Sequence, residues 1–224
     1  MFVVSRARQR RIAMQYSIDI TIDKNGLDKI YDVHQTVTFV KSVNQFVGAN
    51  TFSYYYPVAW LAFQPLESNN VSWIENYYMY ASTTVLQSGN VIKMNSQTAS
   101  VVQTGWLYTF ANGMFTGAQG GGSPGTFNLY NGMATPDFSF GLAQYATVNN
   151  TQTLAPLNAV PVLYNQGATF TPMETVSIFL SSCSANGTVI PDIPSNALTL
   201  TLTPKNPSAN VGFNDTNNEF YIII

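Results

Sequence analysis

The sequence predicts an all-β protein: a single antiparallel β-sandwich, jelly-roll-like or Greek-key, with one short helix near the N-terminus. Apolar residues make up 46% and aromatic residues 13% of the 224 residues, which is enough for a full core without the help of disulfides. Apolar and polar residues alternate in many short segments, as is typical of half-buried strands. About ten to twelve such segments follow one another at the spacing expected of a sandwich or barrel.

Residues 1–13 differ from the rest of the chain, because they hold all four arginines and no acidic residue. They lack the apolar stretch of a secretory signal and are too short and too charged to span a membrane. Two interpretations stay open: a basic arm that mediates a contact, or an extension upstream of a functional start at Met14. We therefore expect a flexible basic extension over 1–13, a β-sandwich domain over 14–224, and a cytoplasmic or non-classically released protein.

The domain begins with a strand, a short helix and a second strand. Alternation starts at Tyr16 and gives a strand with one solvated face. Asn25 is a candidate N-cap, and Gly26 weakens the helix that follows, so we expect one or two turns. Alternation returns over Val33–Val43 and places His34, the only histidine, on a strand.

The central stretch, Pro57–Thr84, carries the largest concentration of aromatic side chains in the chain. We expect it to form a hairpin of two strands, Val58–Phe63 and Val71–Thr83, joined by a turn around Pro65. Large aromatic side chains dominate the energetics of cores and interfaces. The aromatic residues of the two strands are Trp60, Phe63, Trp73, Tyr77, Tyr78 and Tyr80.

The second half of the chain reads as further strands separated by turns. The glycine-rich segment 117–125 lacks the patterns of phosphate-binding loops, so we expect a flexible hairpin or an inter-sheet connection. Leucine and threonine alternate over Ala197–Thr203, which is the clearest strand. We expect the apolar segment Phe220–Ile224 to be shielded from water and to close a sheet.

Charge is scarce, at 9% of residues, and this limits the partners. Beyond residue 13 the chain holds five lysines and no arginine against eleven acidic residues, a formal charge of −6. Such a body has no basic patch for nucleic acid and little attraction to anionic lipid. Weak charge repulsion favours self-association.

No metal site or cofactor is expected, since the sequence has no cysteine–histidine cluster, no calcium loop and no nucleotide-binding pattern. Glu75 is the most interesting acidic residue, because it lies on the predicted strand between Trp73 and Tyr77. If this face is exposed, it is a contact surface and Glu75 needs no special role. If the face is buried, Glu75 is a buried acid and a candidate for acid catalysis.

The segment Asn44–Tyr56 is expected to be a loop whose aromatic rings either fold back onto the sandwich or form a contact patch. We expect a non-catalytic interaction protein that self-associates as a homo-oligomer or binds a protein partner. One alternative is a lectin-like, carbohydrate-binding module or a toxin-like module that targets a lipid headgroup. A second alternative is a hydrolase that uses an acidic residue such as Glu75. The candidate binding residues are the aromatics Phe52, Tyr54, Tyr55, Tyr56, Trp73 and Tyr77.

Overall fold

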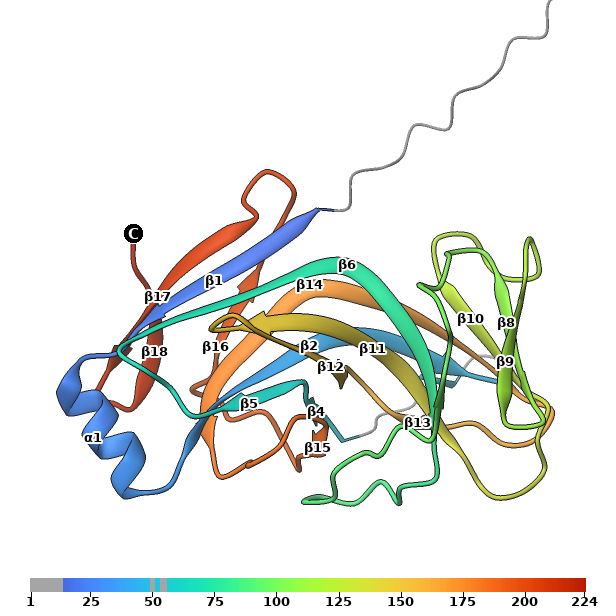
Figure 1. Cartoon of the computed structure of the whole chain (residues 1–224), viewed down its shortest axis with the longest axis horizontal. Coiled ribbons are helices and arrows are strands. Elements are labelled where there is room, and N and C mark those ends of the chain that lie inside the picture. The colour runs from blue at the N-terminus through green and yellow to red at the C-terminus, as the bar shows by residue number, and fades with distance from the viewer. Residues whose placement is uncertain (1–13, 49–50, 53–55) are drawn as a thin grey trace, which may run out of the picture.

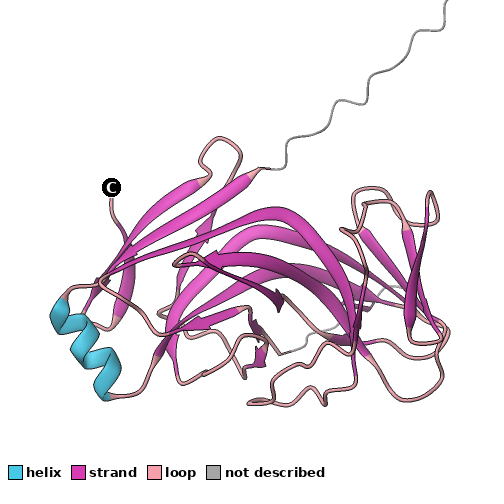
Figure 2. Cartoon of the chain, viewed as in Figure 1, coloured by secondary structure: helices cyan, strands magenta, loops and turns pink. Residues whose placement is uncertain are grey.

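The computed structural model describes residues 14–48, 51–52 and 56–224. This part of the chain consists of eighteen strands and one helix, which confirms the all-β class (Figure 2). The predicted basic extension, residues 1–13, lies outside the described residues.

Eight strands form the first large sheet, called sheet A here. They are β1 (Gln15–Thr21), β6 (Ser68–Ser82), β7 (Ser96–Gln97), β11 (Ser139–Val148), β12 (Thr151–Pro156), β13 (Val160–Pro161), β17 (Ser208–Asn214) and β18 (Glu219–Ile222). The order across the sheet is β12-β11-β6-β1-β17-β18, with β13 attached to β11 and β7 attached to β6.

Eight more strands form sheet B. They are β2 (Thr36–Val47), β3 (Thr51–Phe52), β5 (Leu61–Phe63), β8 (Leu107–Ala111), β9 (Met114–Ala118), β10 (Phe127–Asn131), β14 (Gly167–Ser181) and β16 (Leu198–Thr201). The order is β3-β2-β14-β10-β8-β9, with β16 attached to β14 and β5 attached to β2. A separate short pair joins β4 (Val58–Ala59) to β15 (Thr188–Val189).

Both large sheets are mixed, although the sequence predicted an antiparallel arrangement. In sheet A, β1 pairs with β17 in parallel and with β6 antiparallel. In sheet B, β10 pairs with β8 in parallel. Alternation within a strand does not reveal the direction of its partner, so the sequence could not distinguish these cases. Jelly-roll or Greek-key connectivity stays a prediction.

One hydrophobic core is shared by the two sheets. The alternation that starts at Tyr16 buries Tyr16, Ile18 and Ile20 of β1, and sheet B contributes residues such as Phe39 and Ile178. The long strands β6 and β14 arch across the molecule (Figure 1). Their curvature positions the candidate site described below.

The central stretch is not the predicted hairpin. Its first part, β5, pairs with β2 in sheet B, whereas β6 pairs with β1 and β11 in sheet A. The connection therefore passes from one sheet to the other. Trp60 and Trp73 meet across the core with their ring centroids 5.4 Å apart and their planes at 86°. The aromatic side chains of this stretch therefore pack between the two sheets and not between two neighbouring strands of one sheet.

The predicted helix is present as α1 (Lys24–Asp32) and is longer than one or two turns. Its N-cap is Asp23, whose carboxylate accepts a hydrogen bond of 2.7 Å from the Gly26 amide, so the assignment of Asn25 as the cap was wrong. His34 has a φ of 54° in the turn before β2, and its predicted place on a strand was also wrong.

Two later predictions also need correction. The glycine-rich segment 117–125 connects β9 and β10, which both belong to sheet B and lie on either side of β8, so it is neither a hairpin nor an inter-sheet connection. Phe220 is buried, but the apolar residues that follow are not. Tyr221 and Ile222 are each 49% exposed on β18. The segment does form the last strand of sheet A, as predicted, but it is not shielded from water.

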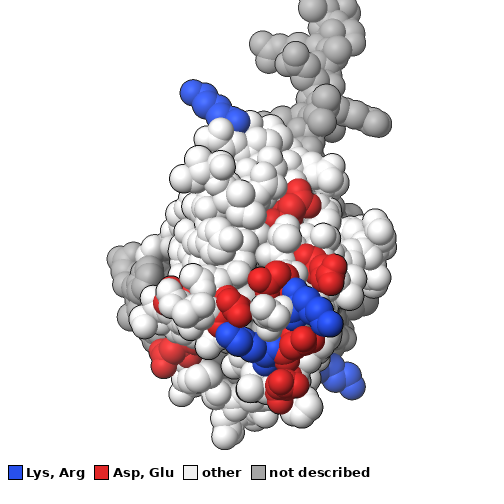
Figure 3. All heavy atoms as spheres, turned by 90° about the vertical axis from the view of Figure 1, so that its left-hand side faces the viewer, with Lys and Arg blue, Asp and Glu red and all other residues white. Residues whose placement is uncertain are grey.

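The end of the molecule that carries α1 holds acidic and basic side chains close together (Figure 3). Lys29 and Asp215 form an ion pair of 3.0 Å there. Within the described residues, no helix has the length and apolar character needed to cross a membrane.

Candidate functional site

The aromatic residues predicted to form a binding surface do not form a single surface. Trp73 and Tyr77 are buried, which corrects their assignment as surface residues. Phe52 lies in β3, and Tyr56 is 47% exposed. Tyr54 and Tyr55 lie outside the described residues. A binding role for the segment around Phe52 and Tyr56 stays a prediction.

The face of β6 that carries Trp73, Tyr77 and Met79 is buried, yet Glu75 on the same face is exposed. A β-bulge explains the difference. Trp73 pairs with Ala146 and Tyr77 with Gln144, so three residues of β6 stand opposite one residue of β11. The extra residues bend the strand outward and carry Glu75 out of the core.

Strand β14 contains a matching bulge in the other sheet. Pro172 pairs with Val43 and Val176 with Lys41, so three residues of β14, with Glu174 in their centre, stand opposite one residue of β2. Bulges re-aim side chains and are common next to active sites. Each large sheet therefore carries one glutamate at the centre of a bulge.

Glu174 lies in a dense network of hydrogen-bond donors. Lys41 Nζ donates to both carboxylate oxygens at 2.8 and 2.7 Å. Trp73 Nε1 donates to Oε2 and the Tyr77 hydroxyl to Oε1, each at 2.7 Å. Four hydrogen bonds thus fix the orientation of this carboxylate. All three residues that donate them are buried.

Lys41 is a fully buried cation that reaches Glu174 from β2. Its Nζ also donates to Gln144 Oε1 at 2.9 Å. It lies 5.3–5.5 Å from the ring centroids of Trp60, Trp73 and Tyr77, which is within the range of cation–π attraction. Among the described residues, the ammonium therefore contacts an amide oxygen, a carboxylate and three aromatic rings.

Burial and charge shift the titration of this cluster. Burial lowers the pKa of Lys41 from 10.5 to about 8, and the Glu174 carboxylate opposes this change. Burial is the main cause that raises the pKa of Tyr77, and the negative charge of Glu174 is the second. Burial is also the main cause that raises the pKa of Tyr16, followed by its hydrogen bond to Glu75. Groups with shifted pKa values gather at functional sites, and these three surround the two glutamates.

Glu75 and Glu174 line the same cleft, which has a volume of about 720 Å³. Glu75 accepts a single hydrogen bond, of 2.5 Å, from the Tyr16 hydroxyl. Aromatic and neutral polar residues make up much of the remaining wall, among them Asn76, Tyr77, Gln103, Thr104, Phe127 and Thr171. The sequence indicated Glu75 but not Glu174 or Lys41, because no local pattern links residues that lie 133 positions apart.

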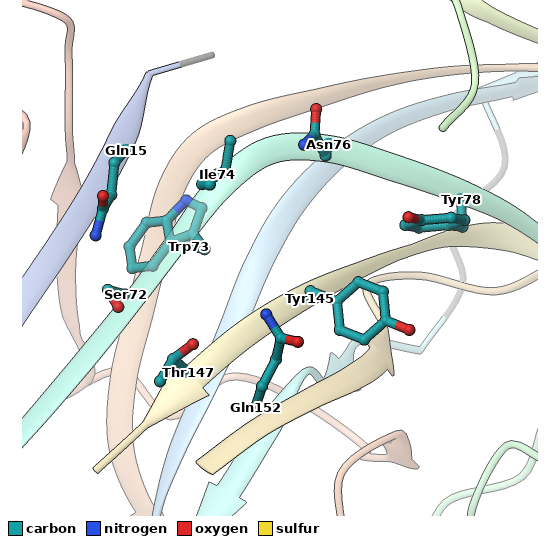
Figure 4. Close-up of a pocket in the computed structure, with 9 residues that line it drawn as sticks. All are labelled: Gln15, Ser72, Trp73, Ile74, Asn76, Tyr78, Tyr145, Thr147 and Gln152. Carbon is teal, nitrogen blue, oxygen red and sulfur yellow. The ribbon is translucent and has the colours of Figure 1, made fainter. Parts of the chain in front are cut away.

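A second hollow, called the sheet-A groove here, lies on the outer side of sheet A and has a volume of about 190 Å³ (Figure 4). Tyr78 and Tyr145 meet edge to face in it, with ring centroids 5.6 Å apart. Apart from Trp73, whose Nε1 donates to Glu174, seven of its side chains carry polar groups: Gln15, Ser72, Asn76, Tyr78, Tyr145, Thr147 and Gln152.

None of these seven side chains forms a hydrogen bond with another group of the described chain. Among the described residues, no charged side chain lines the groove. Side chains of this kind usually bond to backbone or water, so seven that have no partner among the described residues can serve a ligand. No sequence pattern indicates the groove, because its residues come from four strands.

Comparison of the chain with protein families, with curated proteins and with solved structures found no match. Within the described residues, no group of three or more histidine, cysteine, aspartate or glutamate side chains is arranged to hold a metal ion.

Proposed function

We propose that the chain binds an uncharged carbohydrate in the sheet-A groove. This is the carbohydrate-binding alternative that the sequence left open, with a different set of residues. The observation that carries it is a set of seven polar side chains that have no hydrogen-bond partner in the described chain and lie around a hollow that no charged described residue lines. A ligand that matches them must offer many donors and acceptors and no net charge.

The chemistry of the side chains fits the hydroxyl groups of a sugar. Gln15, Asn76 and Gln152 each present a donor and an acceptor from one amide, and hydroxyl groups of a sugar both donate and accept. Tyr78 and Tyr145 offer ring surface for the apolar face of a sugar ring. The volume of about 190 Å³ is suited to one sugar residue, with neighbouring residues of the saccharide outside the groove.

A glycan array followed by calorimetry tests the proposal. Tyr145→Ala should weaken binding of the best glycan at least about tenfold, which corresponds to roughly 1.4 kcal/mol. Tyr164→Ala is the matched control, because Tyr164 is also exposed and lies outside the groove. The proposal fails if the array is silent, or if the two substitutions have equal effects on binding.

A second candidate function is self-association, and the edge strand β18 favours it. Edge strands are usually protected by lysine or proline, but β18 contains neither and exposes Tyr221 and Ile222. We propose that β18 pairs antiparallel with β18 of a second copy, which extends sheet A across a twofold axis.

Light scattering after size-exclusion chromatography tests this second candidate. The chain should form dimers at high concentration, and Ile222→Lys should return it to monomers, because it places a charge on the pairing edge. Ile193→Lys is the control at an exposed isoleucine elsewhere. A wild-type chain that stays monomeric at a concentration of several hundred micromolar contradicts the proposal.

A further inference from the structure

We propose that the cleft between the bulges of β6 and β14 is a catalytic site that hydrolyses a glycosidic bond. In this proposal Glu75 is the general acid and base, and Glu174 is the nucleophile. The proposal goes beyond carbohydrate binding in the sheet-A groove and does not depend on it, because the carboxylates lie in a different hollow.

The two carboxylates have different surroundings, and this supports different roles. Glu174 is held by four hydrogen bonds, two of them from a cation, and its side chain is 12% exposed. Glu75 is exposed and accepts one hydrogen bond from a neutral hydroxyl group. Glycosidases likewise use two carboxyl groups in different surroundings, one as the nucleophile and one as the acid and base.

The position of the two groups supports a shared substrate. Glu75 comes from sheet A and Glu174 from sheet B, and both line one cleft. Hydrolysis of a glycosidic bond requires a carboxyl group on each side of the bond. The paired bulges bring one carboxyl group from each sheet to this cleft, since a regular strand would direct Glu75 into the core with Trp73 and Tyr77.

The buried ion pair is more easily explained by a reaction than by stability. Removing Lys41 and Glu174 from water is costly, and apolar residues of similar size often stabilise a core equally well. The ion pair is explained if the reaction needs a carboxylate that Lys41 holds in a fixed orientation in the cleft. Lys41 is then a positioning residue, since it contacts Glu174 and is itself fully buried.

The wall of the cleft indicates the class of substrate. With Glu75 protonated, as the reaction requires, the charges of Glu174 and Lys41 balance, so the described residues of the cleft leave no unpaired cation for an acidic sugar. Phe127 and Tyr77 offer ring surface, and Gln103 and Thr104 offer polar groups. The volume of about 720 Å³ is large enough for more than one sugar residue, so we expect a neutral or amino-sugar oligosaccharide.

The reaction balances with water as the only co-reactant. The protonated Glu75 gives its proton to the glycosidic oxygen. At the same time one Glu174 oxygen gives up one of its two hydrogen bonds and uses that electron pair to bond to the anomeric carbon, and the carbon–oxygen bond to the leaving sugar breaks. Glu75 then takes a proton from water, whose oxygen displaces Glu174 from the anomeric carbon. Both carboxyl groups return to their starting states, and the product keeps its anomeric configuration.

The test uses the purified full chain with fluorogenic glycosides of neutral and amino sugars, and with soluble polysaccharides in a reducing-end assay. We expect turnover that falls about 10²–10⁴-fold in Glu75→Gln, which is the usual contribution of acid–base catalysis. Glu67→Gln is the matched control at an exposed glutamate outside the cleft and should keep full activity. A 2-fluoro glycoside of the hydrolysed sugar should label Glu174 covalently.

The role of Glu174 is tested by labelling the wild-type chain, so no variant at this buried ion pair has to fold. Absence of turnover on the whole panel overturns it, as does full activity in Glu75→Gln or a label on another residue. Tyr145→Ala separates the two sites, because it should reduce glycan binding in the groove while Glu75→Gln leaves that binding unchanged.

Discussion

Replacing Lys41 by methionine should destabilise the protein more than any exposed substitution. Lys41 is fully buried and the Glu174 side chain is only 12% exposed. The substitution removes three hydrogen bonds, two to Glu174 and one to Gln144, and with them the only cation that contacts Glu174 in the described chain. Breaking a buried ion pair from one side costs about 3–5 kcal/mol. For a chain of this length that corresponds to a fall in Tm of roughly 6–20 °C.

Urea and thermal unfolding followed by circular dichroism measure this effect. Lys93→Met is the matched control, because Lys93 is exposed and its ammonium makes no contact in the described chain, and it should change the unfolding free energy by less than about 0.5 kcal/mol. The double variant Lys41→Met/Glu174→Gln should recover at least half of the loss, since no buried charge remains. A loss below about 1 kcal/mol in Lys41→Met, or strictly additive effects in the double variant, refutes the reasoning.

Three further predictions concern the fold. Because the pKa of Lys41 is about 8 in the folded chain and near 10.5 when unfolded, the unfolded chain binds more protons between these values. The unfolding free energy should therefore gain up to about 1.4 kcal/mol per pH unit from pH 8 to 10 in urea titrations, and Lys41→Met should remove this gain. Gly141→Ala should lower the unfolding free energy by about 3 kcal/mol or more in the same assay, since its Cβ would lie 2.0 Å from the Asn158 carbonyl oxygen. Gly212→Ala is the control and should lower it much less, because the new Cβ meets only the movable ring of Tyr221. Asp23→Ala should cost about 1 kcal/mol through loss of the helix cap, and Asp23→Asn should restore most of it.

The sequence predicted strands better than it predicted their partners. The alternation from Tyr16 onward correctly indicated a half-buried strand, because side-chain direction alternates whatever the neighbour is. The prediction of a hairpin for the central stretch was wrong. Both of its halves are apolar enough for the core, but they pair in different sheets, and the apolar pattern alone does not tell which sheet each half joins. The parallel pairing of β1 with β17 joins strands nearly 200 positions apart, and no local signal encodes it.

The candidate site shows the same limit. Glu75 was singled out because a carboxyl group among aromatic residues conflicts with the pattern of the strand. The conflict was resolved by a bulge, which depends on the register with β11 and cannot be read from β6 alone. Glu174 and Lys41 each look ordinary in the sequence, and their importance arises only where the two sheets meet.

The central claim, that the sheet-A groove binds an uncharged carbohydrate, is tested most directly by an NMR titration of the chain with the best glycan from the array. The side-chain amide signals of Gln15, Asn76 and Gln152 should shift together and saturate at a single dissociation constant, while the amide signal of Asn217, at a distant turn, stays in place. Saturating shifts that leave these three amides unchanged contradict the claim.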